Sequence, residues 1–220
     1  MKRILLLLLL ATGAFAQSPI KAGDLHQLAE SVDKHYNALN TLQTQFTEIY
    51  QGGGMSRTES GTMWIKKPGK MLWEYAIPRQ KLFVTDGKTA WFYVPGERQA
   101  RRASVKKLDD LRSPLRYLLG RTKLEKEFNA LSFAPDQRPI NAGDVVLRGV
   151  PKGMEDRVSQ VLLEVTPENR LARIFIEELD GSQTDFRFKD QKENVPVADS
   201  RFSFKPPAGV EVMEATELQP

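Results

Sequence analysis

The sequence predicts a mainly β fold of about ten or eleven antiparallel strands, with one early helix and a few short central ones. Short apolar runs recur along most of the chain and are separated by Gly, Pro and Asp turn signals. Aromatic residues are concentrated in consecutive runs within residues 61–93, which hold every tryptophan of the chain. A sheet of this size tends to curl, and helices over one of its mouths would enclose an apolar cavity.

The first residues have the pattern of a secretory signal peptide. Met1-Lys2-Arg3 is basic, residues 4–10 are apolar, and Ala14-Phe15-Ala16 matches a small-x-small cleavage site. The apolar run is too short to span a bilayer, and no later run is long enough to do so. We therefore expect residues 1–16 to be removed on export. Because repeats and linkers are absent, residues 17–220 should form one soluble domain.

Composition excludes several classes of function. None of the 220 residues is cysteine, which excludes a disulfide framework and a lipid-anchoring cysteine beside the cleavage site. The formal net charge of +4 falls to +2 on removal of the signal, because Lys2 and Arg3 carry two of the positive charges. A charge this small argues against binding to nucleic acid or to an anionic membrane.

The N-terminal half predicts a helix followed by five strands. Apolar residues recur at helical spacing over residues 24–40, with Asp24 placed to cap the helix. These residues are Leu25, Leu28, Val32, Tyr36 and Leu39. The turn Gly52-Gly53-Gly54 should end the first strand. The predicted strands cover about 42–50, 57–67, 71–76, 80–85 and 89–94.

The last two of these strands should form a hairpin at Asp86-Gly87, which is a strong turn signal. If the turn has two central residues, Phe83 faces the same side as Ala90 and Phe92. Leu82 and Trp91 then share the other side. Both sides are apolar, so the pattern leaves open which of them lines the interior.

The C-terminal half begins with helix signals and returns to strands. Ser104 can cap a short helix carrying Val105, Leu108 and Leu111. Ser113-Pro114 can start another that carries Leu115, Leu118 and Leu119. The predicted strands after these helices cover about 144–148, 158–165, 171–178, 183–189 and 201–204.

The sequence gives little support for catalysis. His26 and His35 are nine residues apart on the predicted helix, which is not the spacing of a metal site. The acidic pairs Asp109-Asp110 and Glu177-Glu178 are adjacent in sequence, so their members do not share a helix or strand face. Nucleophile motifs and phosphate-binding glycine motifs are absent. We expect no enzymatic activity, no metal and no cofactor.

A basic run lies between the aromatic strands and the central helices. It consists of Arg98, Arg101, Arg102, Lys106 and Lys107. Such a run is usually a solvated face, and docking of an acidic partner is the alternative. Nucleic acid is a poor fit, because the cluster is small and the chain is exported.

Strand alternation gives the aromatic strands one apolar face and one wetter face. In residues 71–75, Met71, Trp73 and Tyr75 share a face opposite Glu74. In residues 63–67, the face of Met63 and Ile65 also carries Lys67. Burying an unpaired ammonium costs several kcal/mol. Lys67 must therefore reach the rim, bond carbonyl groups on a covering helix, or show that this face is not the interior.

Several fragments follow one another in a specific order. They are Thr44-Gln45-Phe46-Thr47, Gly61-x-Met63-Trp64-Ile65-Lys66-Lys67-Pro68, Trp73-Glu74-Tyr75 with Pro78, Val84-Thr85-Asp86-Gly87-Lys88-Thr89-x-Trp91-x-Tyr93 and Phe202-x-Phe204-x-Pro206-Pro207-x-Gly209-Val210. In this order, behind a signal peptide and without cysteine, they resemble the LolA family of periplasmic carriers of outer-membrane lipoproteins. The resemblance covers most of the mature chain.

The resemblance implies an incomplete antiparallel β-barrel with a lid of short helices over a hydrophobic cavity. The cavity would take the acyl chains of triacylated lipoproteins in the periplasm. Cargo would come from an inner-membrane lipoprotein-releasing ABC transporter and pass to an outer-membrane receptor lipoprotein. We expect the carrier to be a monomer.

The resemblance also places candidate residues by position. The cavity candidates are Leu42, Met63, Ile65, Met71, Trp73, Phe83, Leu115, Leu118 and Ile174, and the aromatic strands add Tyr75, Trp91 and Phe92. Leu115 and Leu118 would belong to the lid. Lys67 stands where the family has an arginine that bonds lid backbone and keeps the empty carrier closed. Lysine offers a point charge with three donors and lacks the planar fork of arginine, so its strength as a latch can differ.

Two alternatives use the same fold. A lipid- or lipoprotein-sensing regulatory module would bind the same kind of ligand as a signal, and such proteins usually add a second domain. The outer-membrane receptor of the pathway would need a lipidated cysteine, and the chain has none.

Overall fold

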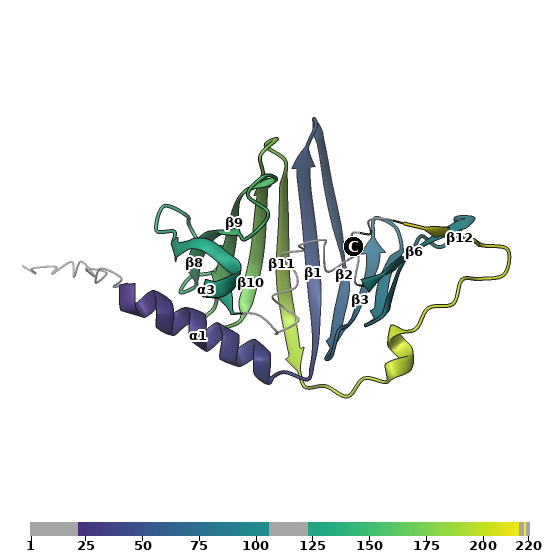
Figure 1. The fold of residues 1–220 in the computed structure, drawn as a ribbon, viewed down its shortest axis with the longest axis horizontal. Helices are drawn as coiled ribbons and strands as arrows, with labels where there is room; N and C mark the ends of the chain where they lie inside the picture. The colour runs from purple at the N-terminus through teal and green to yellow at the C-terminus, as the bar shows by residue number, and fades with distance from the viewer. Residues whose placement is uncertain (1–21, 106–122, 216–217, 219–220) are drawn as a thin grey trace, which may run out of the picture.

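The computed structural model describes residues 22–105, 123–215 and 218, and its strands form one sheet (Figure 1). Twelve strands lie in the order β12-β6-β5-β4-β3-β2-β1-β11-β10-β9-β8-β7. Neighbouring strands are antiparallel except β12 and β6, which are parallel. Because β12 and β7 are the two edges, the sheet is open and does not close on itself.

The strands and helices follow one another in this order along the chain: α1 (Ala22–Ala38), β1 (Thr41–Gly52), β2 (Met55–Lys66), β3 (Lys70–Ile77), β4 (Lys81–Asp86), β5 (Thr89–Tyr93), β6 (Gln99–Ser104), α3 (Leu124–Glu127), β7 (Phe128–Phe133), β8 (Val145–Pro151), β9 (Val158–Val165), β10 (Leu171–Glu178), β11 (Gln183–Glu193), the 3-10 helix η2 (Asp199–Phe202) and β12 (Glu211–Glu214).

Helix α1 confirms the helical periodicity of the N-terminal segment. It begins and ends two residues before the predicted bounds of 24 and 40. Its buried residues belong to the same apolar cluster as one face of the sheet, and they are Ala29, Val32 and Tyr36. In Figure 1 the helix runs along the end of the β8–β11 half of the sheet.

The two faces of the sheet bury different side chains. One face, called here the inner face, carries Met63, Trp73 and Phe83 and packs against α1. The outer face carries Leu72 and Val84 between β2 and β5. The C-terminal segment covers this part of the outer face with Val197, Phe202 and Phe204. The inner face is therefore the one that helix α1 covers, and the outer face is covered by the segment that contains η2.

The β4–β5 hairpin confirms the predicted facing. Thr85 pairs with Ala90 and Phe83 pairs with Phe92, so the turn has two central residues. Phe83, Ala90 and Phe92 belong to the inner-face cluster. Leu82 and Trp91 belong to the outer-face cluster. The structure thus settles which side of this hairpin is the inner one.

The predicted strand map missed three strands and misassigned one segment. No strand was predicted at β6, β7 or β12, and the sheet has twelve strands, not ten or eleven. The predicted strand 201–204 is instead η2 followed by extended chain. Phe202 and Phe204 do alternate, but they pack on the outer face of the sheet and do not form a further strand of it. The predicted helix start at Val105 is the last described residue before the gap, and the rest of both central helices lies outside the described residues.

Candidate functional site

Strand register assembles the candidate residues of the inner face. Residues directly opposite one another on neighbouring strands share a face of the sheet. One row across β1 to β5 runs Thr44, Met63, Trp73, Phe83 and Phe92. The next row runs Leu42, Ile65, Met71, Thr85 and Ala90. Five strands therefore present one continuous surface whose side chains are almost all apolar.

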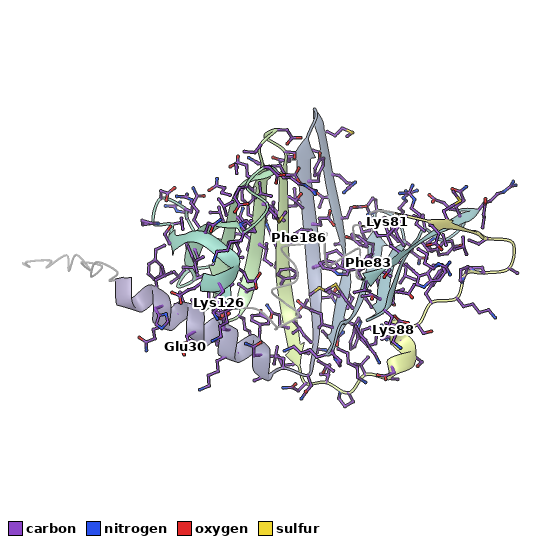
Figure 2. All side chains as sticks on the ribbon, in the orientation of Figure 1. Glu30, Lys81, Phe83, Lys88, Lys126 and Phe186 are labelled. Carbon is purple, nitrogen blue, oxygen red and sulfur yellow. The ribbon has the colours of Figure 1, made fainter. Side chains whose placement is uncertain are left out.

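An aromatic group occupies the centre of this surface. The ring of Trp73 lies 4.6 Å from that of Phe46 and 5.8 Å from that of Phe186, both edge to face. Tyr75 stacks beside Trp73 at 6.3 Å. Gly61 lies between Phe46 and Tyr75 in the register, and a side chain there would collide with the Glu74 carbonyl group of β3. Figure 2 labels Phe83 and Phe186, which come from strands on either side of β1 to β3.

The structure brings most of the predicted cavity residues together. Those buried in the inner-face cluster are Leu42, Met63, Ile65, Met71, Trp73, Tyr75, Phe83 and Ile174, and Phe92 is partly buried there. Trp91 is a correction: it lies on the outer face, where its ring packs 5.5 Å from that of Phe204. Strand alternation causes this, because Trp91 and Phe92 are neighbours in β5. Leu115 and Leu118 lie outside the described residues.

Sequence reasoning missed three aromatic members of the site, which are Phe46, Phe186 and Phe188. All three are buried in the inner-face cluster. Phe186 and Phe188 alternate in β11, and Phe46 follows Leu42 and Thr44 on the same face of β1. The period-two pattern was therefore the available signal.

Lys67 bonds the covering helix. Its Nζ donates to the backbone carbonyl of Tyr36, and its backbone N–H donates to the carbonyl of Asn40 at 2.9 Å. The Tyr36 carbonyl lies in the last turn of α1, where carbonyl groups lack partners within the helix and carry the negative end of the helix dipole. An ammonium group suits this position. Of the three outcomes open for Lys67, the structure shows the bond to a covering helix.

Other contacts tie α1 to β10 and to α3. The Tyr36 hydroxyl accepts a hydrogen bond from the Leu171 N–H at 2.8 Å. Burial raises the pKa of this hydroxyl, so Tyr36 stays protonated. The Asp33 carboxylate accepts from the Leu124 N–H at 3.0 Å, and His26 Nδ1 lies 2.7 Å from Glu125 Oε2. Helix α1 is thus attached along its length by polar contacts that can each break.

A charged group interrupts the inner face toward the β1–β2 turn. We call Glu48, Glu59, Lys81, Tyr75 and Arg57 the inner ion cluster. Lys81 Nζ donates to Glu59 Oε2 at 2.6 Å and lies 4.0 Å from the centre of the Tyr75 ring. The Tyr75 hydroxyl donates to Glu48 Oε2 at 2.7 Å. Arg57 reaches both carboxylates, at 2.8 Å from Glu59 and 3.4 Å from Glu48.

Burial changes the acidity of this cluster. Burial raises the pKa of Glu48, and its bonds from Tyr75 and nearby cations oppose that rise. Burial and the Glu48 carboxylate raise the pKa of Tyr75, so the phenol keeps its proton and remains the donor. The two glutamates face each other across β1 and β2, which is unfavourable without the neighbouring cations. The cluster therefore depends on all of its members.

The described residues contain no group of three or more His, Cys, Asp or Glu side chains that could hold a metal ion. Within the same residues, no helix is both long enough and apolar enough to cross a membrane. The inner face offers apolar contact over a wide area, and its charged groups are engaged with one another. Such a surface is suited to holding an apolar ligand.

The sequence is similar to known proteins over most of its length. The family model described as "Outer membrane lipoprotein carrier protein LolA" matches residues 37–205. An outer-membrane lipoprotein carrier protein of Nitrosospira multiformis is 32% identical over 159 residues, covering 71% of this chain and 73% of that protein. One from Chromobacterium violaceum is 30% identical over 205 residues, covering 92% and 93%.

Solved structures resemble the fold with little sequence identity. The lipoprotein LppX of Mycobacterium tuberculosis is 14% identical and superposes with a TM-score of 0.52. The match covers 81% of this chain and 99% of that chain. At this level of identity the likeness concerns the fold alone.

Proposed function

Because the chain belongs to the LolA family of outer-membrane lipoprotein carrier proteins, we propose that it holds the acyl chains of lipoproteins against the inner face of its sheet. It is a carrier and not an enzyme. The single observation that supports the acyl-binding surface is the continuous apolar area across β1 to β5, centred on Trp73. Acyl chains need contact area and no directional bonds, and this surface offers that.

The inner face is already buried in this structure. Met63, Trp73 and Ile174 are all 0% exposed. An acyl chain can therefore reach them only after covering groups move away. Helix α1 is one such cover, because its apolar side belongs to the same cluster. In our proposal α1 is part of a lid, Lys67 is a latch on it, and the sheet is an incomplete barrel around the resulting cavity.

The contacts of the closed lid also help the carrier to release cargo, because they compete with cargo binding. Three acyl chains contain on the order of 40 methylenes, and full burial at about 0.8 kcal/mol each would give tens of kcal/mol. That exceeds the binding free energy of any reversible complex. A carrier that releases its cargo must bury the chains in part, or offset the gain with the cost of opening. The contacts of Lys67, Asp33 and Tyr36 with their partners supply such a cost.

The proposal extends to location and partners. Triacylated lipoproteins would be loaded in the periplasm by an inner-membrane ABC transporter and delivered to an outer-membrane receptor lipoprotein. The predicted signal peptide, residues 1–16, agrees with a periplasmic site of action. The carrier would act as a monomer with one cargo molecule.

The test is co-purification with defined cargo. The chain is purified from the periplasm of a host that makes a tagged triacylated lipoprotein, and native mass spectrometry measures the mass of the complex. We expect a one-to-one complex that is lost when the cargo is made without acyl chains. Free phospholipid in place of lipoprotein would instead favour the lipid-sensing alternative, and no bound lipid of any kind would overturn the acyl-binding surface.

A further inference from the structure

The apolar part of the inner face has a charged boundary at each end. Lys67 and the end of α1 lie at one end. The inner ion cluster lies at the other, toward the β1–β2 turn. In Figure 2, Lys81 and Lys88 mark opposite ends of the β4–β5 hairpin, with Phe83 between them. A ligand lying along the strands would therefore meet charge at both ends of its path.

The inner ion cluster is closed to additional ligands of its own. Its two carboxylates, one ammonium and one guanidinium sum to zero charge. The Lys81 and Glu59 side chains are 9% and 5% exposed, and Glu48 is 6% exposed. Lys81 bonds Glu59 and Tyr75 bonds Glu48, while Arg57, whose side chain is 52% exposed, reaches both carboxylates from the rim. The cluster is thus a poor site for a polar head group and a strong barrier to a methylene chain, which offers it no hydrogen bonds.

The distance between the two boundaries fits one acyl chain. Lys67 directly follows β2 and is eight residues from Glu59 within it, or roughly 27 Å at the rise of a strand. Charged side chains occupy part of that length at each end. Between them the inner-facing residues are Ile65, Met63 and Gly61. One leaflet of a bilayer holds an acyl chain in about 15 Å, half the thickness of the hydrocarbon core.

We propose that the inner ion cluster is a length gauge that sets the longest acyl chain the carrier accepts. This rests on the proposed function. The chain enters at the Lys67 end, because the latch there joins the sheet to the last turn of α1. It lies along β2 and β3 over Met63 and Trp73, and its methyl end stops at the Glu59–Lys81 pair.

The physical argument is that a buried ion cluster is weak evidence for a role in stability. Replacing buried ion pairs with apolar residues of similar size is often neutral or stabilising. An apolar residue at Glu48, Glu59 and Lys81 would also lengthen the acyl-binding surface. The charged residues therefore limit the surface, and their effect falls on chain length.

The test compares single-chain lipopeptides of graded length. The probes are N-acylated Cys-Ser-Lys-Lys peptides with lauroyl, myristoyl, palmitoyl, stearoyl, arachidoyl and behenoyl chains, and calorimetry measures their dissociation constants. For the unmodified protein we expect affinity to rise by up to about fourfold for each methylene, the value for full burial. The rise should level off at stearoyl. The quadruple variant E48L/E59L/Y75F/K81L should continue to gain affinity through behenoyl.

A matched control lies on the opposite face of the same sheet. Arg173 and Asp185 form a partly buried ion pair at 2.7 Å on β10 and β11, next to inner-facing Ile174 and Phe186. The double variant R173L/D185L removes this ion pair, and the pair of Asp185 with Arg187, without touching the inner face. Its affinity for the lipopeptides should level off at stearoyl, as that of the unmodified protein does. Circular dichroism melting of both variants shows whether they are folded.

A second measurement uses the unmodified protein and does not depend on the variants folding. A palmitoyl probe with a diazirine at its methyl end should photo-crosslink to the segments around Glu48 and Tyr75. Crosslinks confined to α1 or Lys67 would overturn the proposed direction and the gauge with it. An unchanged plateau in the folded quadruple variant would overturn the gauge alone. Absence of binding by the unmodified protein to every probe would overturn both the gauge and the proposed function.

Discussion

At the scale of single residues, Lys67 illustrates how one side chain couples the sheet to its cover. Its backbone bonds Asn40 and its ammonium bonds the Tyr36 carbonyl, so both groups hold the junction between α1 and β1. The ammonium is half-buried and meets the negative end of the helix dipole. An arginine in this place would have a planar fork, whereas the ammonium is a compact charge that suits the Tyr36 carbonyl.

Replacing Lys67 should make the carrier easier to open. In Lys67→Leu the charge-assisted bond to α1 is lost, which we expect to weaken the closed state by about 1 kcal/mol after allowance for partial exposure. Cargo then competes with a weaker closure. The dissociation constant of a palmitoyl lipopeptide should fall by about fivefold, with slower release. Stopped-flow displacement measures both quantities.

Lys67→Arg is the matched control, because it retains a cationic donor at the same position. Its affinity and release rate should stay close to those of the unmodified protein. Equal affinities for the leucine variant and the unmodified protein would show that Lys67 does not contribute to the latch.

At the scale of elements, helix α1 is held by contacts that include a titratable pair. The hydrogen bond to Glu125 and the charge of that carboxylate raise the pKa of His26 above its ordinary value. The pair joins α1 to α3. A group whose pKa is raised by folding contributes stability below its unfolded pKa, and this contribution is lost as pH rises through the folded pKa. Attachment of α1 near His26 should therefore weaken as pH rises from about 6 to 8.

Hydrogen exchange resolves this effect by segment. Amide protons in the first turns of α1 should show less protection at pH 8 than at pH 6, after correction for the intrinsic rate of exchange. In His26→Gln, which cannot be protonated, the difference should disappear. A protection difference that persists in this variant would assign the pH dependence to another group.

The elements also show what the sequence could and could not predict. Helix α1 and the hairpin at Asp86-Gly87 followed from local patterns, because their periodicity and turn residues are strong. β6 was not predicted, because its sequence QARRAS buries only two small alanines. β12 has four exposed residues and no alternation of burial. Strands at or near a sheet edge bury little, so periodicity carries little signal there.

The candidate site, like the fold, could be predicted only in part from the sequence. Alternation grouped Met71, Trp73 and Tyr75 correctly, while the assignment of Trp91 required the register of the hairpin. The inner ion cluster could not be predicted, because its members come from four strands. Their meeting depends on the register between these strands, in which Tyr75 lies opposite Gly61 and a shift between Gly61 and Ser60 then pairs Ser60 with Ile77. Local sequence does not specify such a shift.

At the scale of the whole molecule, the two faces of the sheet have different covers. The outer face between β2 and β5 is covered by the C-terminal segment, which is fixed by buried Phe202 and by parallel pairing of β12 with β6. The inner face is covered in part by α1, which is held by separable polar contacts. In our proposal the outer side stays closed as a core, and the inner side is uncovered when cargo binds.

The absence of cysteine in the chain allows a direct test of this division. Phe92 and Trp91 are adjacent on β5, are both partly buried, and lie on opposite faces. In Phe92→Cys the thiol should react with a maleimide whenever the inner face opens. A lipopeptide at ten times its dissociation constant should slow this reaction about tenfold, because only the unoccupied fraction reacts. In Trp91→Cys the lipopeptide should leave the rate unchanged, because the thiol lies under the C-terminal segment. Equal protection at both positions would mean that cargo tightens the whole fold, and protection of the outer position alone would place the acyl chains on the wrong face of the sheet.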